Sequence, residues 1–151
     1  MMNVLNVMYW WINQKEFLRN FSEDETRLQQ ARRFWKSLEE TDLEVWIAII
    51  GLTGIVCVSY YTWFNKIFRP FGYHYRRRYW VGALLVCWIL LFACIFYIDQ
   101  SVLYVGLSGS NDILWTRRVS AIGWSTCIYI LLSIIWCLWL PTNAYRWVKF
   151  K

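Results

Sequence analysis

The sequence has little histidine and little proline, and its longest apolar stretches contain no Asp, Glu, Lys, Arg or His. One His and two Pro occur among 151 residues. A single histidine, His74, excludes a bis-histidine haem and disfavours a histidine-based metal centre, since imidazole is the commonest metal ligand. The five cysteines all fall in apolar stretches, where they behave as small hydrophobic residues rather than as a disulfide framework. We therefore expect no metal and no cofactor.

The three longest uncharged stretches are residues 45–64, 80–98 and 119–140. Each is about 20 residues long, so a helix rising about 1.5 Å per residue would cover the ~30 Å hydrocarbon core of a bilayer. Proton relays, ion-coupled transport and voltage sensing normally place ionisable side chains inside the membrane. The sequence therefore predicts three transmembrane helices and disfavours a secondary transporter.

Recognisable catalytic arrangements are also missing. The Ser-Gly-Ser segment at 108–110 lacks the lysine and the glycine spacing of a phosphate-binding loop. A nucleophilic serine there would need a base, but His74 falls on the opposite side of the membrane in the predicted topology. Asp99 and Asp112 are a possible carboxylate pair, although nothing in the sequence holds them together. We expect a protein that is not an enzyme and has no small-molecule substrate.

Basic residues outnumber acidic ones and give a formal net charge of +6. Many stand beside the apolar stretches, where Lys and Arg set orientation and contact anionic headgroups, so no nucleic-acid partner is expected. The connector 65–79 and the tail 142–151 together hold slightly more of them than the opposite side. We therefore expect an N-terminus outside and a C-terminus in the cytoplasm, and the compact size suggests a bacterial inner membrane. The candidates for binding an anionic lipid headgroup are Arg69, Arg76, Arg77 and Arg78.

Two amphipathic helices are predicted ahead of the first span. Residues 1–12 place apolar side chains at helical spacing, which is typical of a helix that lies on the membrane or docks on a partner. The segment lacks the basic start and the small-residue cleavage site of a signal peptide. A second helix is predicted over 22–40, opened by a capping box of Ser22 and Glu25.

A further capping box, Thr41 with Glu44, predicts a break between this second helix and the first span. The second helix carries one apolar stripe, which must pack on the first helix, on the membrane surface or on a partner. The candidate partner-docking residues of the stripe are Leu28, Ala31, Trp35 and Leu38.

The expected chain is thus all-α and has three parts. Residues 1–42 form an amphipathic helical region, residues 43–141 a three-helix transmembrane domain, and residues 142–151 a basic C-terminal tail. Small residues recur along each span, and in lipid such faces let helices approach closely. They would hold the three helices together or mediate self-association. The predicted packing residues are Ala48, Gly51, Gly54, Cys57, Ala83, Cys87, Cys94, Gly123 and Cys127.

These features favour a non-enzymatic integral membrane subunit that acts as an anchor or assembly component, with copies of itself or other membrane subunits as partners. An alternative is an oligomeric pore or membrane-disrupting effector, in which Thr53, Ser59 and Ser125 could line a narrow path. A second alternative is a protein that recognises anionic lipids through its arginine cluster.

Overall fold

The described part of the chain is all-helical. A computed structural model describes residues 14–63, 77–102, 107 and 109–139. The predicted helix over residues 1–12 lies outside these ranges. Among the described residues there is no strand, and the helices in chain order are α1 (Gln14–Arg19), α2 (Glu25–Thr62), α3 (Arg77–Asp99) and α4 (Ser110–Trp139).

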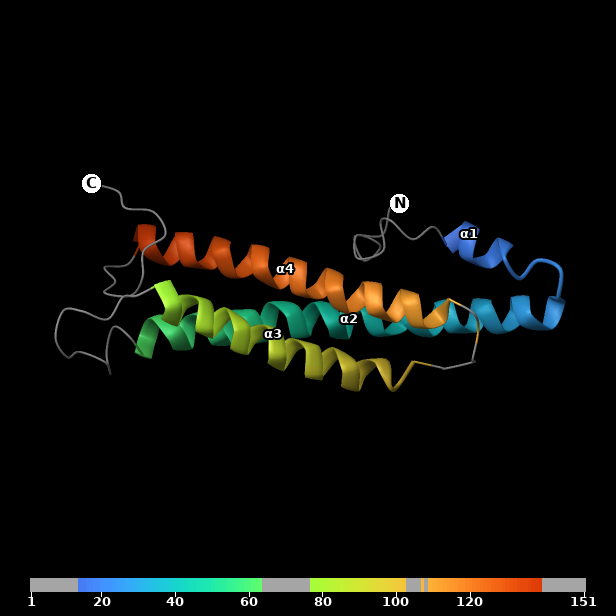
Figure 1. Ribbon diagram of the computed structural model, residues 1–151, viewed down its shortest axis with the longest axis horizontal. Helices are drawn as coiled ribbons and strands as arrows, with labels where there is room; N and C mark the ends of the chain where they lie inside the picture. The colour runs from blue at the N-terminus through green and yellow to red at the C-terminus, as the bar shows by residue number, and fades with distance from the viewer. Residues whose placement is uncertain (1–13, 64–76, 103–106, 108, 140–151) are drawn as a thin grey trace.

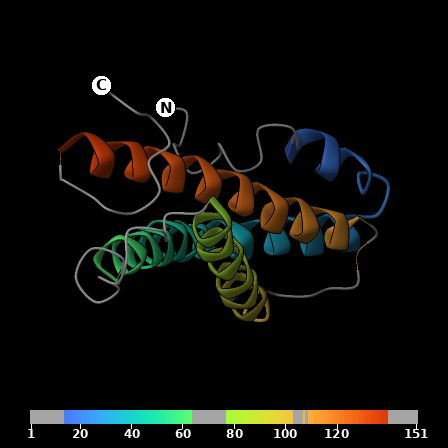
Figure 2. The same ribbon diagram turned by 60° about the vertical axis from the view of Figure 1, so that its left-hand side comes forward.

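Helices α2, α3 and α4 form a long bundle. They run lengthwise beside one another, and α1 lies at the end of the bundle where α2 and α4 begin (Figure 1). In a turned view, α3 is inclined relative to α2 and α4 (Figure 2). Helix α2 is central, because it packs against each of the other three helices.

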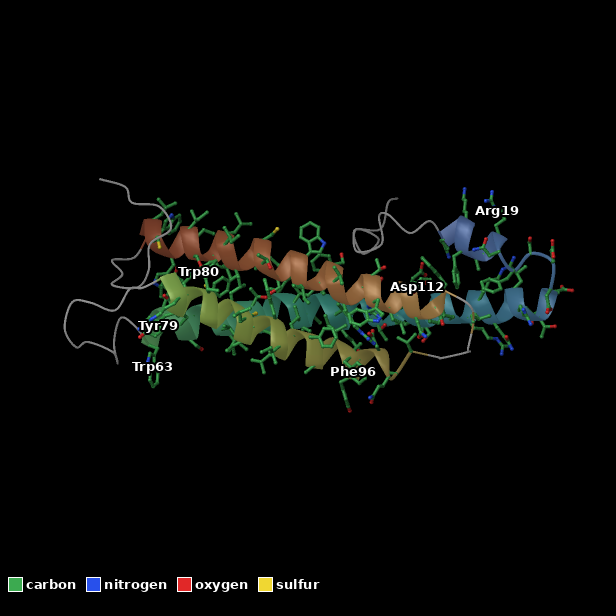
Figure 3. All side chains as sticks on the ribbon, viewed as in Figure 1. Arg19, Trp63, Tyr79, Trp80, Phe96 and Asp112 are labelled. Carbon is green, nitrogen blue, oxygen red and sulfur yellow. The ribbon has the colours of Figure 1, made fainter. Side chains whose placement is uncertain are left out.

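Three helices, α2, α3 and α4, are long and apolar enough to cross a membrane, which confirms the predicted all-α class with three candidate spans. Large apolar side chains stay exposed over 43–63, 79–97 and 115–139. These stretches are about 30 Å or slightly longer along a helix, the thickness of the hydrocarbon core. Trp63 and Tyr79 lie at one end of this belt, and Phe96 lies toward the other (Figure 3). Aromatic rings at both edges of an aliphatic band match the two headgroup layers of a bilayer.

Helix α2 is continuous, so the predicted break before the first span is wrong. Its 38 residues correspond to about 57 Å of helix. The Thr41 hydroxyl does not cap a new helix but donates a hydrogen bond to the Leu38 carbonyl at 3.0 Å within the same one. No Pro or Gly occurs between Glu25 and Ile50. The helix therefore runs without interruption from outside the apolar belt into it.

The start of α2 also differs from the prediction. Asp24, not Ser22, is the N-cap, and its Oδ1 accepts from the backbone N–H groups of Thr26 at 3.0 Å and Arg27 at 3.3 Å. The Ser22 hydroxyl instead donates to the Arg19 carbonyl at 2.8 Å, at the end of α1. A carboxylate accepts these N–H groups well, because it also favours the positive end of the helix dipole.

The apolar core of the bundle continues into a part of the molecule beyond the apolar belt. We call this part the cap: α1, α2 up to Asp42, and the described residues from Val102 to Leu114. The ring of Phe17 lies 5.3 Å from Phe21 and 5.9 Å from Trp35 between centroids. The buried core residues of the cap are Phe17, Phe21, Ala31, Phe34, Trp35, Leu38, Val102, Leu107, Ile113 and Leu114.

The apolar stripe predicted to dock a partner faces this core. Ala31, Trp35 and Leu38 are buried, and Leu28 is half-buried against them. The stripe is therefore covered by the chain's own α1, Val102, Leu107 and the start of α4, and in this arrangement it is not a free surface.

A tight turn leads into α4 and closes the cap. Gly109 has a φ of +85°, in the left-handed region that a residue with a side chain rarely adopts. The Ser110 hydroxyl donates to the Leu107 carbonyl at 2.8 Å, and Ser110 is buried at the start of the helix. Helix α4 thus starts at Ser110, ahead of the predicted span 119–140.

Candidate functional site: a buried ion-pair cluster

The charged residues that border the apolar stretches meet at one end of the bundle. Asp42 precedes the stretch on α2, Asp99 ends α3, and Arg117 and Arg118 precede the stretch on α4. Asp42 and Arg117 have 0% exposure and Asp99 has 6%. We call these four residues the charged cluster. It lies where the cap joins the membrane-spanning part of the bundle.

Arg117 links all three long helices. Its Nη1 lies 3.4 Å from Asp99 Oδ1, and its Nη2 lies 3.4 Å from Asp42 Oδ1. Nη2 also donates a hydrogen bond to Thr41 Oγ1 at 2.8 Å. A guanidinium suits this position, because its N–H donors are fixed in a planar fork that can engage several acceptors at once. One side chain of α4 thereby connects α2 and α3.

Asp99 also binds the neighbouring arginine. Arg118 Nε donates to Asp99 Oδ2 at 2.7 Å, so the two carboxylate oxygens engage two different guanidinium groups. The Arg118 guanidinium carbon lies 5.0 Å from the Phe96 ring centroid and 5.8 Å from that of Trp115. At such distances a ring face attracts a cation. Arg118 therefore bridges the charged cluster to the aromatic edge of the belt.

The charges of the cluster cancel, with two aspartates against two arginines. This balance matters because each ion costs several kcal/mol to remove from water, and a partner with good geometry offsets that cost. The last carbonyls of α3 place partial negative charge beside the Asp99 carboxylate, so the neighbouring arginines are needed to stabilise its charge. Loss of one partner would leave an uncompensated buried charge.

A neutral polar contact lies deeper in the bundle. The hydroxyl oxygens of Thr53 and Ser125 are 2.8 Å apart, and the Cys87 sulfur lies 3.5 Å from Ser125 Oγ and 3.7 Å from Thr53 Oγ1. The three residues are buried and come from α2, α4 and α3 respectively. Such contacts between helices satisfy hydroxyl groups that lipid cannot.

The end of the bundle away from the cap is held by aromatic residues, and we call it the aromatic end. The rings of Tyr61 and Trp136 are stacked, with centroids 5.4 Å apart. Trp80 Nε1 donates to Ser133 Oγ at 3.1 Å, and its ring meets Tyr129 edge-on at 5.0 Å. None of these contacts involves a formal charge.

The small residues predicted to pack helices together are distributed unevenly. An added Cβ at Gly51, Gly54 or Gly123 would meet nothing within 4 Å, so none of these glycines makes room for a neighbouring helix within the chain. Their use in self-association stays a prediction. Cys57 and Cys87 are buried; Ala48, Gly54, Ala83 and Cys94 are half-buried; Gly51, Gly123 and Cys127 are exposed.

The arginines predicted to bind lipid headgroups are described only in part. Arg69, Arg76 and the side chain of Arg77 lie outside the described part of the chain. Arg78 is exposed in the first turn of α3. Its Nη2 donates to the Tyr79 hydroxyl at 3.1 Å, and its guanidinium carbon lies 5.0 Å from the Tyr79 ring centroid.

The charged cluster cross-links the three long helices. Asp42 and Asp99 each bind an arginine, while Asp112 is exposed in the first turn of α4. Among the described residues, no group of three or more His, Cys, Asp or Glu side chains could hold a metal ion. The arrangement offers a fixed, neutral junction between cap and membrane.

Sequence reasoning missed this cluster as a unit, although a signal was present. A chain with three spans places residue 42, residue 99 and residues 117–118 on the same side of the membrane. Two acids and two bases therefore border the apolar stretches at one level. Opposite charges at that level favour pairing, because each is poorly solvated beside the hydrocarbon.

Comparison with known proteins gives no relative: no protein family, curated protein or solved structure matches this chain.

Proposed function

We propose that the protein is a non-enzymatic integral membrane subunit that anchors its cap on the bilayer and assembles there with other subunits. The observation that carries the proposal is the junction between cap and spans. Helix α2 passes through both parts without a break, and Arg117 binds acids from α2 and α3 beside that junction. A cap held in this way keeps a fixed height and orientation relative to the membrane.

The surface offered to partners is the polar outside of the cap. Arg32, Arg33 and Lys36 are exposed on the part of α2 that precedes the apolar belt, opposite its buried face. Exposed arginines are common in protein interfaces, where they set specificity and association rate. The proposed orientation keeps the cap outside and the tail 142–151 in the cytoplasm of a bacterial inner membrane, in agreement with the distribution of basic residues.

The contacts inside the bundle favour an anchor over a pore. Of the three residues that could line a polar path, Thr53 and Ser125 are buried and bonded to each other within one chain, and Ser59 is exposed. An oligomeric pore would need hydroxyl groups directed to the surface between copies. The described helices instead expose aliphatic side chains such as Ile47, Ile55 and Leu131.

The test is the mass and protein composition of the complex extracted from cells in a mild detergent. The proposal predicts a hetero-complex that the double change Arg32→Glu, Arg33→Glu dissociates. The control change Ile47→Ala, on the apolar belt, should leave it intact. A pure homo-oligomer that makes liposomes leak would contradict the anchor and favour the pore.

A further inference from the structure

A groove opens between α2 and α3 inside the apolar belt. It has a volume of about 540 Å³ and is lined by Ile55, Ser59 and Trp63 of α2 and by Ala83 and Val86 of α3. This volume falls within the ~300–1,000 Å³ range of ligand pockets in proteins. Val56 and Tyr60 also line it, and its walls are almost entirely hydrocarbon.

The groove follows the direction of a lipid chain. From Ile55 to Trp63 it spans about 12 Å along α2, more than two turns. Trp63 marks its end at the aromatic edge of the belt (Figure 3). Ile55 lies eight residues earlier on the helix, within the apolar stretch. A groove of this orientation, open to the hydrocarbon on one side, fits part of an acyl chain that descends from the headgroup layer.

The positive charge of the exposed Arg78 lies at the headgroup end of the same surface. Tyr79, Ala83 and Val86 are spaced four and three residues apart on α3, so they share one face of the helix. The contacts of Arg78 with the Tyr79 hydroxyl and ring hold the guanidinium beside this face. Among the described residues Arg78 makes no ion pair, and most of its five N–H donors remain available to an oxyanion.

We propose that this groove binds one anionic glycerophospholipid, with an acyl chain between α2 and α3 and the headgroup phosphate on Arg78. The combination of a hydrocarbon groove and an adjacent guanidinium at headgroup depth matches both halves of such a lipid. The inference is independent of the anchor proposed above, because it concerns the end of the bundle away from the cap.

The test uses the purified full-length chain in an uncharged detergent, with thermal unfolding as the readout of binding. Phosphatidylglycerol should raise the Tm more than phosphatidylcholine does, and inorganic phosphate at the same ionic strength should not raise it. Arg78→Gln should weaken the apparent affinity for phosphatidylglycerol by about tenfold, the effect of losing a charge-assisted hydrogen bond. Arg19→Gln, at an exposed position of α1 on the cap, is the matched control and should bind as the unchanged protein does.

A second pair of variants tests the groove itself. Val86→Phe fills it, whereas Ile89→Phe introduces the same ring at an exposed position of α3 that does not line the groove. Val86→Phe should lose the preference for phosphatidylglycerol, and Ile89→Phe should keep it. Equal stabilisation by the two lipids, or identical behaviour of the two Phe variants, would overturn the proposal. So would efficient cross-linking of Val86→Cys to another polypeptide, because a helix would then be the occupant.

Discussion

The two ends of the bundle are held together by different chemistry. At the cap end, the charged cluster joins α2, α3 and α4 through four formal charges, three of them on fully or nearly fully buried side chains. At the aromatic end, the same helices meet through the stacked Tyr61 and Trp136 and through a neutral hydrogen bond from Trp80 to Ser133. Removing one partner of a buried ion pair leaves an uncompensated charge and strongly lowers stability. Removing one neutral hydrogen bond lowers stability less.

The difference follows from what surrounds each end. The charged cluster is almost completely buried, with Asp42 and Arg117 at 0% exposure and Asp99 at 6%. The aromatic end borders the groove between α2 and α3, because Tyr60 and Trp63 line it. One end is therefore held by buried ion pairs, and the other carries the groove that we propose binds a lipid.

The largest expected effect is the removal of the central arginine. Arg117→Met should reduce the free energy of unfolding by about 3–5 kcal/mol, because Asp42 and Asp99 would remain buried without their shared partner. Unfolding in a denaturing detergent titration measures the change. Lys36→Met breaks an exposed ion pair on the same side of the membrane, and this control should change stability by no more than about 0.5 kcal/mol.

A substitution in the core of the cap should lower the free energy of unfolding almost as much as Arg117→Met does. Phe34 is fully buried and its ring centroid lies 6.0 Å from that of Phe17. Phe34→Ala should cost about 3–5 kcal/mol through lost transfer energy and an unfilled cavity. Leu43→Ala, at an exposed lipid-facing position of α2, is the control. A similar loss in both variants would mean that the core residues in the cap are not tightly packed.

The aromatic end should be less sensitive. Trp80→Phe keeps an aromatic ring but removes the donor to Ser133, and it should cost about 1 kcal/mol. The same unfolding titration compares it directly with Arg117→Met. If Trp80→Phe proved the more damaging change, the contrast drawn between the two ends would be reversed.

The smallest change in stability is expected for substitutions at the outward-facing glycines. Gly51→Ala and Gly123→Ala add a methyl group where nothing lies within 4 Å, so each should leave the isolated chain unchanged or stabilise it by about 0.5–1 kcal/mol through helix propensity. Gly51→Leu then tests self-association, with the mass of the protein measured after size-exclusion chromatography. Loss of an oligomer in Gly51→Leu, at unchanged chain stability, would place a contact between copies on this face.

The three spans could be predicted from the sequence because length and the absence of charge decide membrane insertion. The exact ends of the helices could not be predicted, because a helix can continue beyond the residues that are apolar. Nothing in the 36–44 segment breaks a helix, so α2 runs through it even though its charges mark the edge of the apolar stretch. Thr41 with Glu44 matches a capping box in sequence, but the Thr41 hydroxyl bonds back to the preceding turn and to Arg117.

The candidate site required distances that no sequence pattern supplies. Topology places Asp42, Asp99 and Arg117 on one side of the membrane, yet only packing shows that one guanidinium reaches both acids. The apolar stripe on α2 was predictable as a buried face, whereas its cover of α1 and the residues leading into α4 was not. Intrachain and partner contacts produce the same periodic pattern, since both bury one helical face.

The most direct test of the central claim, that the charged cluster fixes the three helices to one another, is a double-mutant cycle between Asp99→Asn and Arg117→Gln. The account predicts that each single change is destabilising and that the double change costs less than their sum, with a coupling of about 1–3 kcal/mol. Additive losses, with coupling near zero, would contradict it and show that these residues stabilise the chain independently.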